Sequence, residues 1–223
     1  MKLALVSDLH GKVLPEVEVC DAFIIAGDIC PDNMFTHRDP LRCATLQAAW
    51  FQETFLPYLN RQLGVAGWVI FIWGNHDFLG EHPELWPELP AGIILLHDSS
   101  VVIDGVKFSG SPWTNVPGNH WALDRSDYLN SMAYRLLDPL TDVLITHGPP
   151  KLILDRVADG ECVGSSALRR ERDLIMPKVH VFGHIHEARG AKEVTGGVCY
   201  NVSAVTETYQ PRVDPIVYTE VNV

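Results

Sequence analysis

Short apolar runs that each end in Asp, Asn or His constrain this chain most. Continuous apolar runs of four to six residues are typical of strands buried on both faces, as in a sheet covered by helices. Polar residues follow five of them, at 3–6, 22–26, 68–73, 143–146 and 179–182. Ligands of α/β sheets bind beyond the carboxyl ends of the strands. We therefore expect these five polar ends to converge on one site.

The remaining pattern predicts an α/β fold. Apolar runs at 93–96 and 198–201 add further strands, and Asp104-Gly105 between two apolar runs predicts a β-hairpin. Helical periodicity predicts helices over 41–63, 124–137 and 165–175. Pro57 is expected to kink or end the first helix, and Ser165 or Ser166 is expected to cap the last.

Length and composition indicate one folded domain. The chain has 223 residues, of which 47% are hydrophobic and 20% are charged, and it carries no internal repeat or linker. This composition excludes a disordered chain, a collagen-like chain and a coiled coil. We expect a single domain spanning 1–223.

The charge balance limits the partners. Lys and Arg number 17 against 28 Asp and Glu, which gives a formal net charge of −11. Duplex nucleic acid and anionic membranes require clustered basic residues, so neither is an expected partner. A small phosphoester or nucleotide remains compatible, because bound cations supply local positive charge. No apolar run approaches the roughly 20 residues of a membrane span.

Cysteine usage indicates a reducing compartment. The five cysteines are odd in number, and no two have Cys-x-x-Cys spacing. Free thiols in the cytoplasm fit this count better than a disulfide framework. The apolar start, residues 1–6, is too short for a signal peptide. We therefore expect a cytoplasmic protein.

The polar residues after the five strands form a ligand set for divalent metals. Imidazole, carboxylate and amide ligands without thiolate suit Mn, Fe, Co, Ni or Zn. With one bridging carboxylate, seven side chains give four contacts to each of two metals. Two ions about 3.5–4 Å apart bind an attacking hydroxide and the phosphoryl oxygens together. The seven candidates are Asp8, His10, Asp28, Asn75, His147, His184 and His186.

His76 is the candidate general acid. It follows Asn75 directly, so it points elsewhere if Asn75 faces a metal. A His beside the metals but not bound to them is suited to protonate a leaving oxygen. We expect the neighbouring Asp77 to orient this imidazole and to raise its pKa.

These blocks resemble the calcineurin-like metallophosphoesterases. Five blocks occur in the family's order between positions 8 and 186. They are Asp8-x-His10, Gly27-Asp28, Gly74-Asn75-His76-Asp77, His147 in Thr-His-Gly-Pro-Pro, and Gly183-His184-x-His186. Wider stretches, such as Gly110–Trp113 and Lys178–Glu187, resemble the metallophosphoesterase-domain-containing and class III cyclic-nucleotide phosphodiesterase-like subgroup.

The resemblance implies a four-layer α/β/β/α sandwich and a role for each residue. Asp8, His10 and His186 would hold the first metal, and Asn75, His147 and His184 the second. Asp28 would bridge the two, and His76 would contact the phosphate and protonate the leaving group. Some subgroup members carry Gly at the position of His184, which impairs a metal site, whereas this sequence retains the His.

The expected activity is that of a binuclear-metal phosphodiesterase. A metal-bound hydroxide would attack small phosphodiesters such as cyclic nucleotides, and Mn²⁺ is the expected metal in vitro. The diester preference and the nucleotide substrate rest on the resemblance. A phosphomonoesterase or protein phosphatase with the same site, and a slow-turnover nucleotide-binding scaffold, remain alternatives.

Several side chains keep two interpretations. Trp113 and Trp121 are expected to anchor a loop by hydrophobic contact, with stacking on a nucleobase as the alternative. His120, in the same loop, is a candidate for covering a substrate base. Apolar residues near the C-terminus either finish a sheet or meet a partner, so a homodimer is left open.

Overall fold

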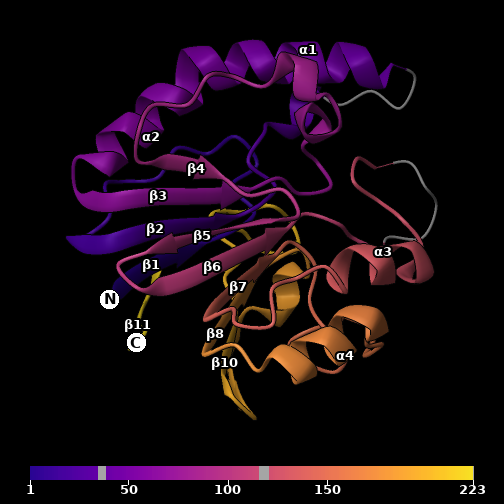
Figure 1. The fold of residues 1–223 in the computed structure, drawn as a ribbon. Helices are drawn as coiled ribbons and strands as arrows, with labels where there is room; N and C mark the ends of the chain where they lie inside the picture. The colour runs from indigo at the N-terminus through magenta and orange to yellow at the C-terminus, as the bar shows by residue number, and fades with distance from the viewer. Residues whose placement is uncertain (35–38, 116–120, 223) are drawn as a thin grey trace.

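The computed structural model describes residues 1–34, 39–115 and 121–222 and contains two β-sheets packed face to face (Figure 1). The first sheet has the order β11-β1-β2-β3-β4, and only its edge strand β11 runs antiparallel to its neighbour. Its strands are β1 (Lys2–Val6), β2 (Cys20–Ala26), β3 (Ala66–Ile72), β4 (Ile93–Leu95) and β11 (Val217–Glu220).

The second sheet has the order β5-β6-β7-β8-β10-β9. Its four central strands are parallel, and both edge strands are antiparallel. The bounds are β5 (Ser99–Ile103), β6 (Val106–Ser111), β7 (Val143–Thr146), β8 (Val179–Phe182), β9 (Gly190–Val194) and β10 (Gly197–Asn201). The predicted hairpin is confirmed, since Asp104 and Gly105 between β5 and β6 both have the positive φ that a tight hairpin turn needs.

The first predicted helix is confirmed but is interrupted. It consists of α1 (Pro40–Trp50), a π-helical segment (Phe51–Phe55) and α2 (Leu56–Leu63). Pro57 lies in the first turn of α2, where its missing N–H is tolerated, so it does not end the helix. Asp39 caps the start of α1 by accepting a hydrogen bond from the Arg42 amide.

Two further helices lie against the second sheet. α3 (Asp127–Tyr134) is shorter than predicted because Ser126 caps its N-terminus, and α4 (Ser166–Ile175) begins after its predicted cap, Ser165. Short 3₁₀ turns cover Asp32–Met34, Phe78–Glu81, Pro83–Leu85 and His186–Ala188. None of the helices in the described ranges is both long and apolar enough to cross a bilayer.

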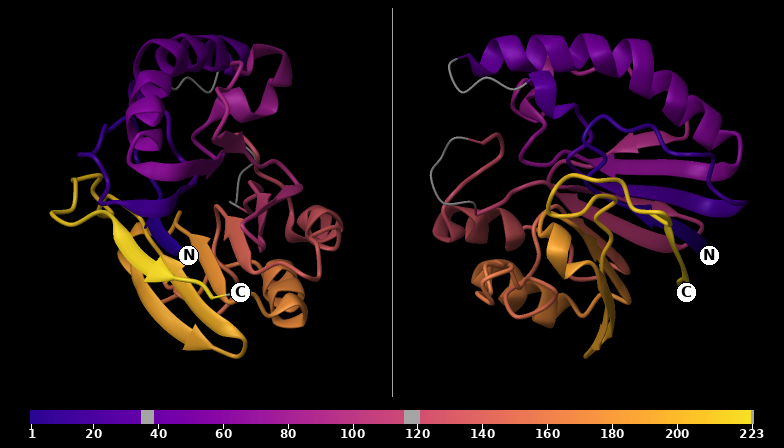
Figure 2. Two further views of the ribbon diagram at one scale, coloured as in Figure 1. Left: turned by 60° about the vertical axis from the view of Figure 1, so that its left-hand side comes forward. Right: turned by 180° about the vertical axis from the view of Figure 1, so that it is seen from behind.

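Alternating side chains build the predicted four-layer α/β/β/α sandwich. Along β1, Leu3 and Leu5 enter the core between the sheets, whereas Ala4 and Val6 enter the core beneath α1 and α2. A third cluster places Leu144 of β7 against α3 and α4. Figure 2 shows the two helical layers on opposite outer faces of the paired sheets.

Main-chain hydrogen bonds join the two sheets at one edge. The Ser7 amide donates to the Val202 carbonyl, and the Ala204 amide donates back to the Ser7 carbonyl. The carboxyl ends of β1 and β2 of one sheet therefore lie beside the segment that follows β10 of the other. This seam holds the polar strand ends.

Candidate metal centre

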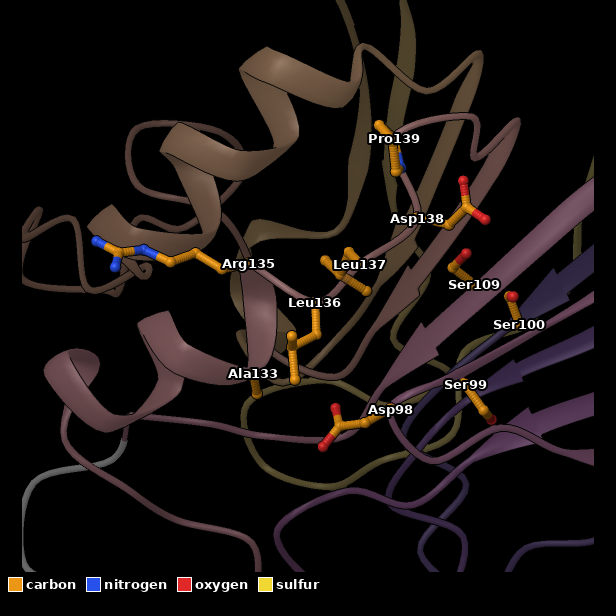
Figure 3. A pocket seen from close by; sticks show the side chains of 10 residues that line it. All are labelled: Asp98, Ser99, Ser100, Ser109, Ala133, Arg135, Leu136, Leu137, Asp138 and Pro139. Carbon is orange, nitrogen blue, oxygen red and sulfur yellow. The ribbon is translucent and has the colours of Figure 1, made fainter.

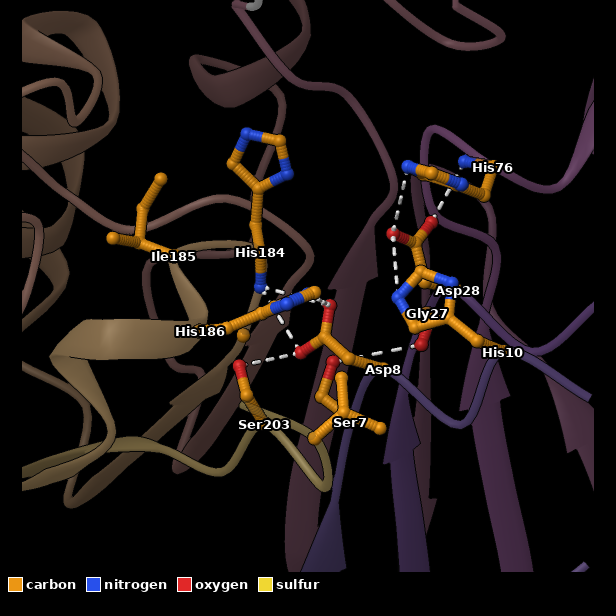
Figure 4. Close-up of polar contacts among 12 residues, drawn as sticks. Ser7, Asp8, His10, Gly27, Asp28, His76, His184, Ile185, His186 and Ser203 are labelled. Carbon is orange, nitrogen blue, oxygen red and sulfur yellow. Dashed lines mark hydrogen bonds and ion pairs between the residues drawn. The ribbon is translucent and has the colours of Figure 1, made fainter. Parts of the chain in front are cut away.

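The structure brings all seven predicted ligands together at the seam between the sheets. Each follows a strand: β1, β2 and β3 in the first sheet, and β7 and β8 in the second. Figure 4 shows the Asp8 side of this site next to the Asp28 side. The ligand atoms form two groups with one carboxylate between them.

The first cluster consists of Asp8, His10 and His186. One ligand atom from each lies within 4.8 Å of the others. The Asp8 Oδ1 atom is 3.3 Å from His186 Nε2. All three side chains are buried, so in water-poor surroundings they would bind a cation strongly.

The second cluster consists of Asn75, His147 and His184. His147 Nε2 lies 3.0 Å from Asn75 Oδ1, and ligand atoms of His147, His184 and Asp28 lie within 4.8 Å of one another. These are the nitrogen and oxygen donors that a borderline divalent ion prefers.

Asp28 lies between the two clusters. Its Oδ2 atom is 3.1 Å from His147 Nε2 of the second cluster and 3.9 Å from His10 Nε2 of the first. A single carboxylate thus faces imidazoles of both clusters. The bridging role that the sequence resemblance implied for Asp28 stays a prediction.

Four of the seven candidate ligands adopt strained backbone conformations. Asp8, His10, Asp28 and His184 have φ of 56°, 45°, 51° and 67°. Residues other than Gly rarely adopt positive φ, and such outliers concentrate at functional sites. The strained turn after each of these strands thus directs the side chain of its ligand into the seam between the sheets.

Glycines next to the ligands make room for them. A Cβ on Gly183 would lie 2.1 Å from Asp8 Oδ2, and a Cβ on Gly74 would lie 2.4 Å from Asp28 Oδ1. Neither position tolerates a side chain without displacing a ligand. This explains why Gly precedes His184 and Asn75 in their blocks.

Hydrogen bonds orient three of the imidazoles. The Nδ1 atoms of His10, His147 and His186 lie 2.9, 2.8 and 3.1 Å from Asp32 Oδ1, the Ala26 carbonyl and the Thr206 carbonyl. Such contacts fix the ring so that Nε2 faces the ligand. His10 Nε2 is buried with no hydrogen-bond partner among the described residues, which fits a position reserved for a metal.

The two buried partners Asp28 and His147 shift each other's pKa. Burial raises the pKa of Asp28, but the charges of His147 and His76 outweigh it and hold that pKa well below its ordinary value. Burial lowers the pKa of His147, but the Asp28 carboxylate beside it raises that pKa to about 9. Without metal, these two groups therefore form a buried ion pair at neutral pH.

Comparison with known proteins decides the family. Residues 1–188 match the calcineurin-like phosphoesterase family. The chain belongs to this family. The chain is 34% identical to metallophosphoesterase domain-containing protein 1 of Homo sapiens and of Mus musculus over 233 residues, which covers 85% of this chain and 69% of each relative.

More distant similarity agrees with this assignment. UPF0046 protein K07C11.7 of Caenorhabditis elegans is 29% identical over 160 residues, covering 65% of this chain and 54% of the worm protein. One solved crystal structure has a TM-score of 0.62 at 17% identity, over 91% of this chain and 90% of the other. At that identity the structural likeness shows the fold alone.

As a calcineurin-like phosphoesterase, the chain is expected to use divalent metals for phosphoester hydrolysis, and the His and Asp clusters fit such ions.

His76 lies beside the two clusters. Its Nδ1 atom is 2.7 Å from Asp32 Oδ1, its Nε2 atom is 4.0 Å from Asp28 Oδ2, and its amide donates to Asp28 Oδ1. Burial lowers the pKa of His76, but Asp28 and Asp32 raise it more, so the net shift is upward.

The structure corrects the prediction that Asp77 orients His76. The Asp77 carboxylate is buried and accepts hydrogen bonds from the amides of Ile29, Cys30 and Gly74. It therefore holds the turns after β2 and β3 together. In this turn the His76 ring contacts Asp32, whereas the Asp77 carboxylate binds main-chain amides, so sequence adjacency was misleading here.

Asp32 is the carboxylate that the sequence analysis missed. Its Oδ1 atom contacts the Nδ1 atoms of both His10 and His76, so it positions a ligand and the candidate acid together. Its place four residues after Asp28, in the same turn, was the only available signal. Nothing in the spacing distinguished it from an ordinary turn residue.

Aromatic rings enclose the open side of the centre. Trp121 stacks on His76 with ring centroids 4.1 Å apart, and Tyr209 lies 4.8 Å from His10 and 5.1 Å from His186. Trp113, by contrast, is buried and donates to Asp98, as expected for a loop anchor. His120 lies outside the described residues.

A larger cavity lies away from the metal centre. Its volume is about 460 Å³, against about 350 Å³ beside the clusters. Figure 3 shows that it lies between the β5–β6 hairpin and the end of α3. Its two carboxylates have partners, since Asp98 accepts from Ser111 and Trp113 and Asp138 pairs with Lys107. We assign it no chemistry.

Proposed function

We propose that the chain is a binuclear-metal phosphodiesterase that hydrolyses small phosphodiesters such as cyclic nucleotides. The observation that carries this proposal is the position of Asp28 between two ligand clusters, with His76 alongside. Membership of the calcineurin-like phosphoesterase family supports the hydrolytic chemistry. The cytoplasmic location, the absence of nucleic-acid and membrane partners and the open homodimer stay predictions.

Two divalent ions, when bound, supply a nucleophile of lowered pKa and polarise the phosphoryl oxygens. The residues of this chain perform the remaining tasks. Asp8, Asp28 and the imidazoles would hold the ions, while Asp32 fixes the ring of His76 through Nδ1, and Asp28 and Asp32 together raise its pKa. His76 then donates its proton to the leaving oxygen, as a general acid.

The cavity beside the centre supports an organic leaving group. Trp121 stacks on the candidate acid, and Tyr209 lies 6.3 Å from it, measured between ring centroids. A leaving group that receives the proton of His76 would emerge between these rings. Planar groups such as nucleobases pack well against aromatic side chains.

The test is hydrolysis by metal-stripped protein that has been resupplied with Mn²⁺. Substrates are monoesters, linear diesters, and 2′,3′- and 3′,5′-cyclic nucleotides, and His76→Ala is assayed in parallel. Diester turnover that requires both Mn²⁺ and His76 is expected. Turnover confined to monoesters would instead favour a phosphatase, and two bound metals without turnover would favour a binding scaffold.

A further inference from the structure

The cavity beside the metal centre has an acidic mouth. Besides the centre's own residues, its described lining contains aromatic and aliphatic side chains and two glutamates, Glu187 and Glu207, but neither Lys nor Arg. We propose that Glu187 and Glu207 select phosphodiesters by disfavouring the second negative charge of a phosphomonoester. This inference rests on the proposed phosphoesterase function and names the residues that set its substrate class.

Glu187 is held at the cavity by its own contacts. It directly follows the ligand His186, and its Oε1 atom accepts a hydrogen bond of 3.0 Å from the Ala158 amide. The side chain is exposed to solvent on the open side of the site. Glu187 lines this cavity and also a neighbouring one that contains Arg156 and Lys192, so its charge lies at the boundary between the two.

Glu207 lies in the loop that closes the other side. The preceding residue, Thr206, positions His186 through its carbonyl, and Tyr209 contacts the rings of His10 and His186. Glu207 is itself exposed and lines the same cavity. The two glutamates thus come from separate segments that both touch the first cluster.

The arginines of this region bind the main chain instead of the cavity. Arg212 donates to the carbonyls of Val205 and His186, and Arg189 donates to those of Ser203, Asp214 and Pro215. Neither guanidinium lines the cavity. Apart from the imidazoles of the centre itself, no described cationic side chain lines the cavity to bind the extra oxygen charge of a monoester.

Charge balance then favours a monoanionic substrate. Asp8, Asp28, Asp32, Glu187 and Glu207 carry five negative charges, which balance the four positive charges of two divalent ions and the single charge of His76 in its protonated form. A phosphodiester brings one negative charge, whereas a phosphomonoester above about pH 6 brings nearly two. The second negative charge of the monoester finds no excess positive charge to bind, and the carboxylates of Glu187 and Glu207 repel it.

The experiment compares two esters with one leaving group: p-nitrophenyl phosphate and methyl p-nitrophenyl phosphate. The Mn²⁺-loaded protein is assayed at pH 8 and low salt, as wild type and as Glu187→Gln, Glu207→Gln and the double variant. Glutamine keeps the shape and still accepts from the Ala158 amide. For charges about 8 Å apart in a water-like dielectric, the monoester-to-diester ratio of kcat/KM should rise about twofold per variant and about fivefold in the double.

Glu193→Gln is the matched control. Glu193 is exposed on β9 and does not line the cavity, so this change removes one charge from the chain elsewhere. Its ratio should equal that of the wild type. Raising the ionic strength to about 0.5 M should raise the wild-type ratio and leave the ratio of the double variant nearly constant, because salt screens exposed charges.

Binding gives a readout that does not depend on turnover. Phenylphosphonate carries the monoester charge but has no ester bond. Because both of its charges face both glutamates, calorimetry with the Mn²⁺-loaded double variant should show about 30-fold tighter binding than with the wild type. If the double variant hydrolyses the diester but its monoester-to-diester ratio of kcat/KM equals that of the wild type, this inference alone would be overturned. Wild-type protein that binds Mn²⁺ but hydrolyses neither ester would overturn the proposed function and this inference with it.

Discussion

The two ligand clusters differ in how firmly their side chains are held. In the first cluster, His10 and His186 are both anchored through Nδ1, and Asp8 accepts a 2.6 Å hydrogen bond from Ser203 Oγ. In the second cluster, His147 is anchored on a carbonyl, but the ring of His184 makes no hydrogen bond with the described residues. Burial and the nearby His147 lower the pKa of His184 to about 3.

This difference predicts unequal metal affinity. Groups that are already oriented lose less conformational freedom when they bind, so the first cluster should hold its ion more tightly than the second. His184 stays neutral at physiological pH and is ready to bind, but its ring must be ordered by the ion itself. Mutations in the two clusters test whether this difference in metal affinity exists.

The largest effect is expected from Asp28→Asn, which affects both clusters at once. Loss of the shared carboxylate should lower kcat about 10³-fold or more and reduce metal content in both positions. Metal analysis and turnover on the preferred diester measure this. Asp214→Asn, an exposed carboxylate away from the site, serves as control. Near-normal turnover of Asp28→Asn would refute its bridging position.

His184→Ala and His186→Ala test the contrast directly. His184→Ala should keep one ion per chain through gel filtration, because the first cluster is intact, whereas His186→Ala should keep less than one. Both should lower kcat about 10²-fold. His82→Ala, which removes a His outside the centre, should retain both ions. If His184→Ala and His186→Ala retain the same amount of metal, the predicted difference in affinity between the two clusters is wrong.

Asp32→Asn should weaken the first cluster and the acid together. Its carboxylate holds both His10 and His76, so a change to amide should lower metal affinity about 10- to 100-fold and also lower kcat. Asp104→Asn, in the β5–β6 turn, is the control. Metal titration separates the two effects, and a variant with reduced kcat but unaltered metal affinity would limit Asp32 to positioning His76.

Proton release should mark the second cluster. His147, with its pKa raised to about 9, is protonated in the metal-free protein at pH 7 and must lose that proton to bind an ion. Apparent affinity at this cluster should therefore rise up to about tenfold per pH unit from pH 7 and level off above about pH 9. Calorimetry in buffers of different ionisation enthalpy counts the protons released. An affinity that is flat over this range would contradict the ion pair with Asp28.

The strand ends were well predicted from the sequence because the pattern that marks them lies within a few adjacent residues. Apolar runs closed by Gly and a polar residue, as at Gly27-Asp28, mark both the strand and the ligand after it. Positions that depend on distant segments were not predictable in this way. Asp32 contacts two imidazoles from other strands, and Tyr209 reaches His10 from a loop near the end of the chain.

Asp77 shows most clearly that neighbours in sequence need not be partners in the folded protein. Adjacency to His76 suggested a pair, but only the folded backbone reveals which side of the turn each side chain faces. The π-helical segment at Phe51–Phe55 was likewise hidden, since helical periodicity alone does not register an extra residue in a turn.

The seam between the sheets also sets the order in which the centre can form. Ligands of the first cluster come from the turns after β1 and after β8, and the Asp8 carboxylate accepts hydrogen bonds from residues 176 and 195 positions further along the chain. During synthesis, β1 to β4 can therefore emerge and begin to pair before His147, His184 and His186, which complete the two clusters, have been made. Stable metal uptake is then a late event in maturation, because each cluster needs ligands from both sheets.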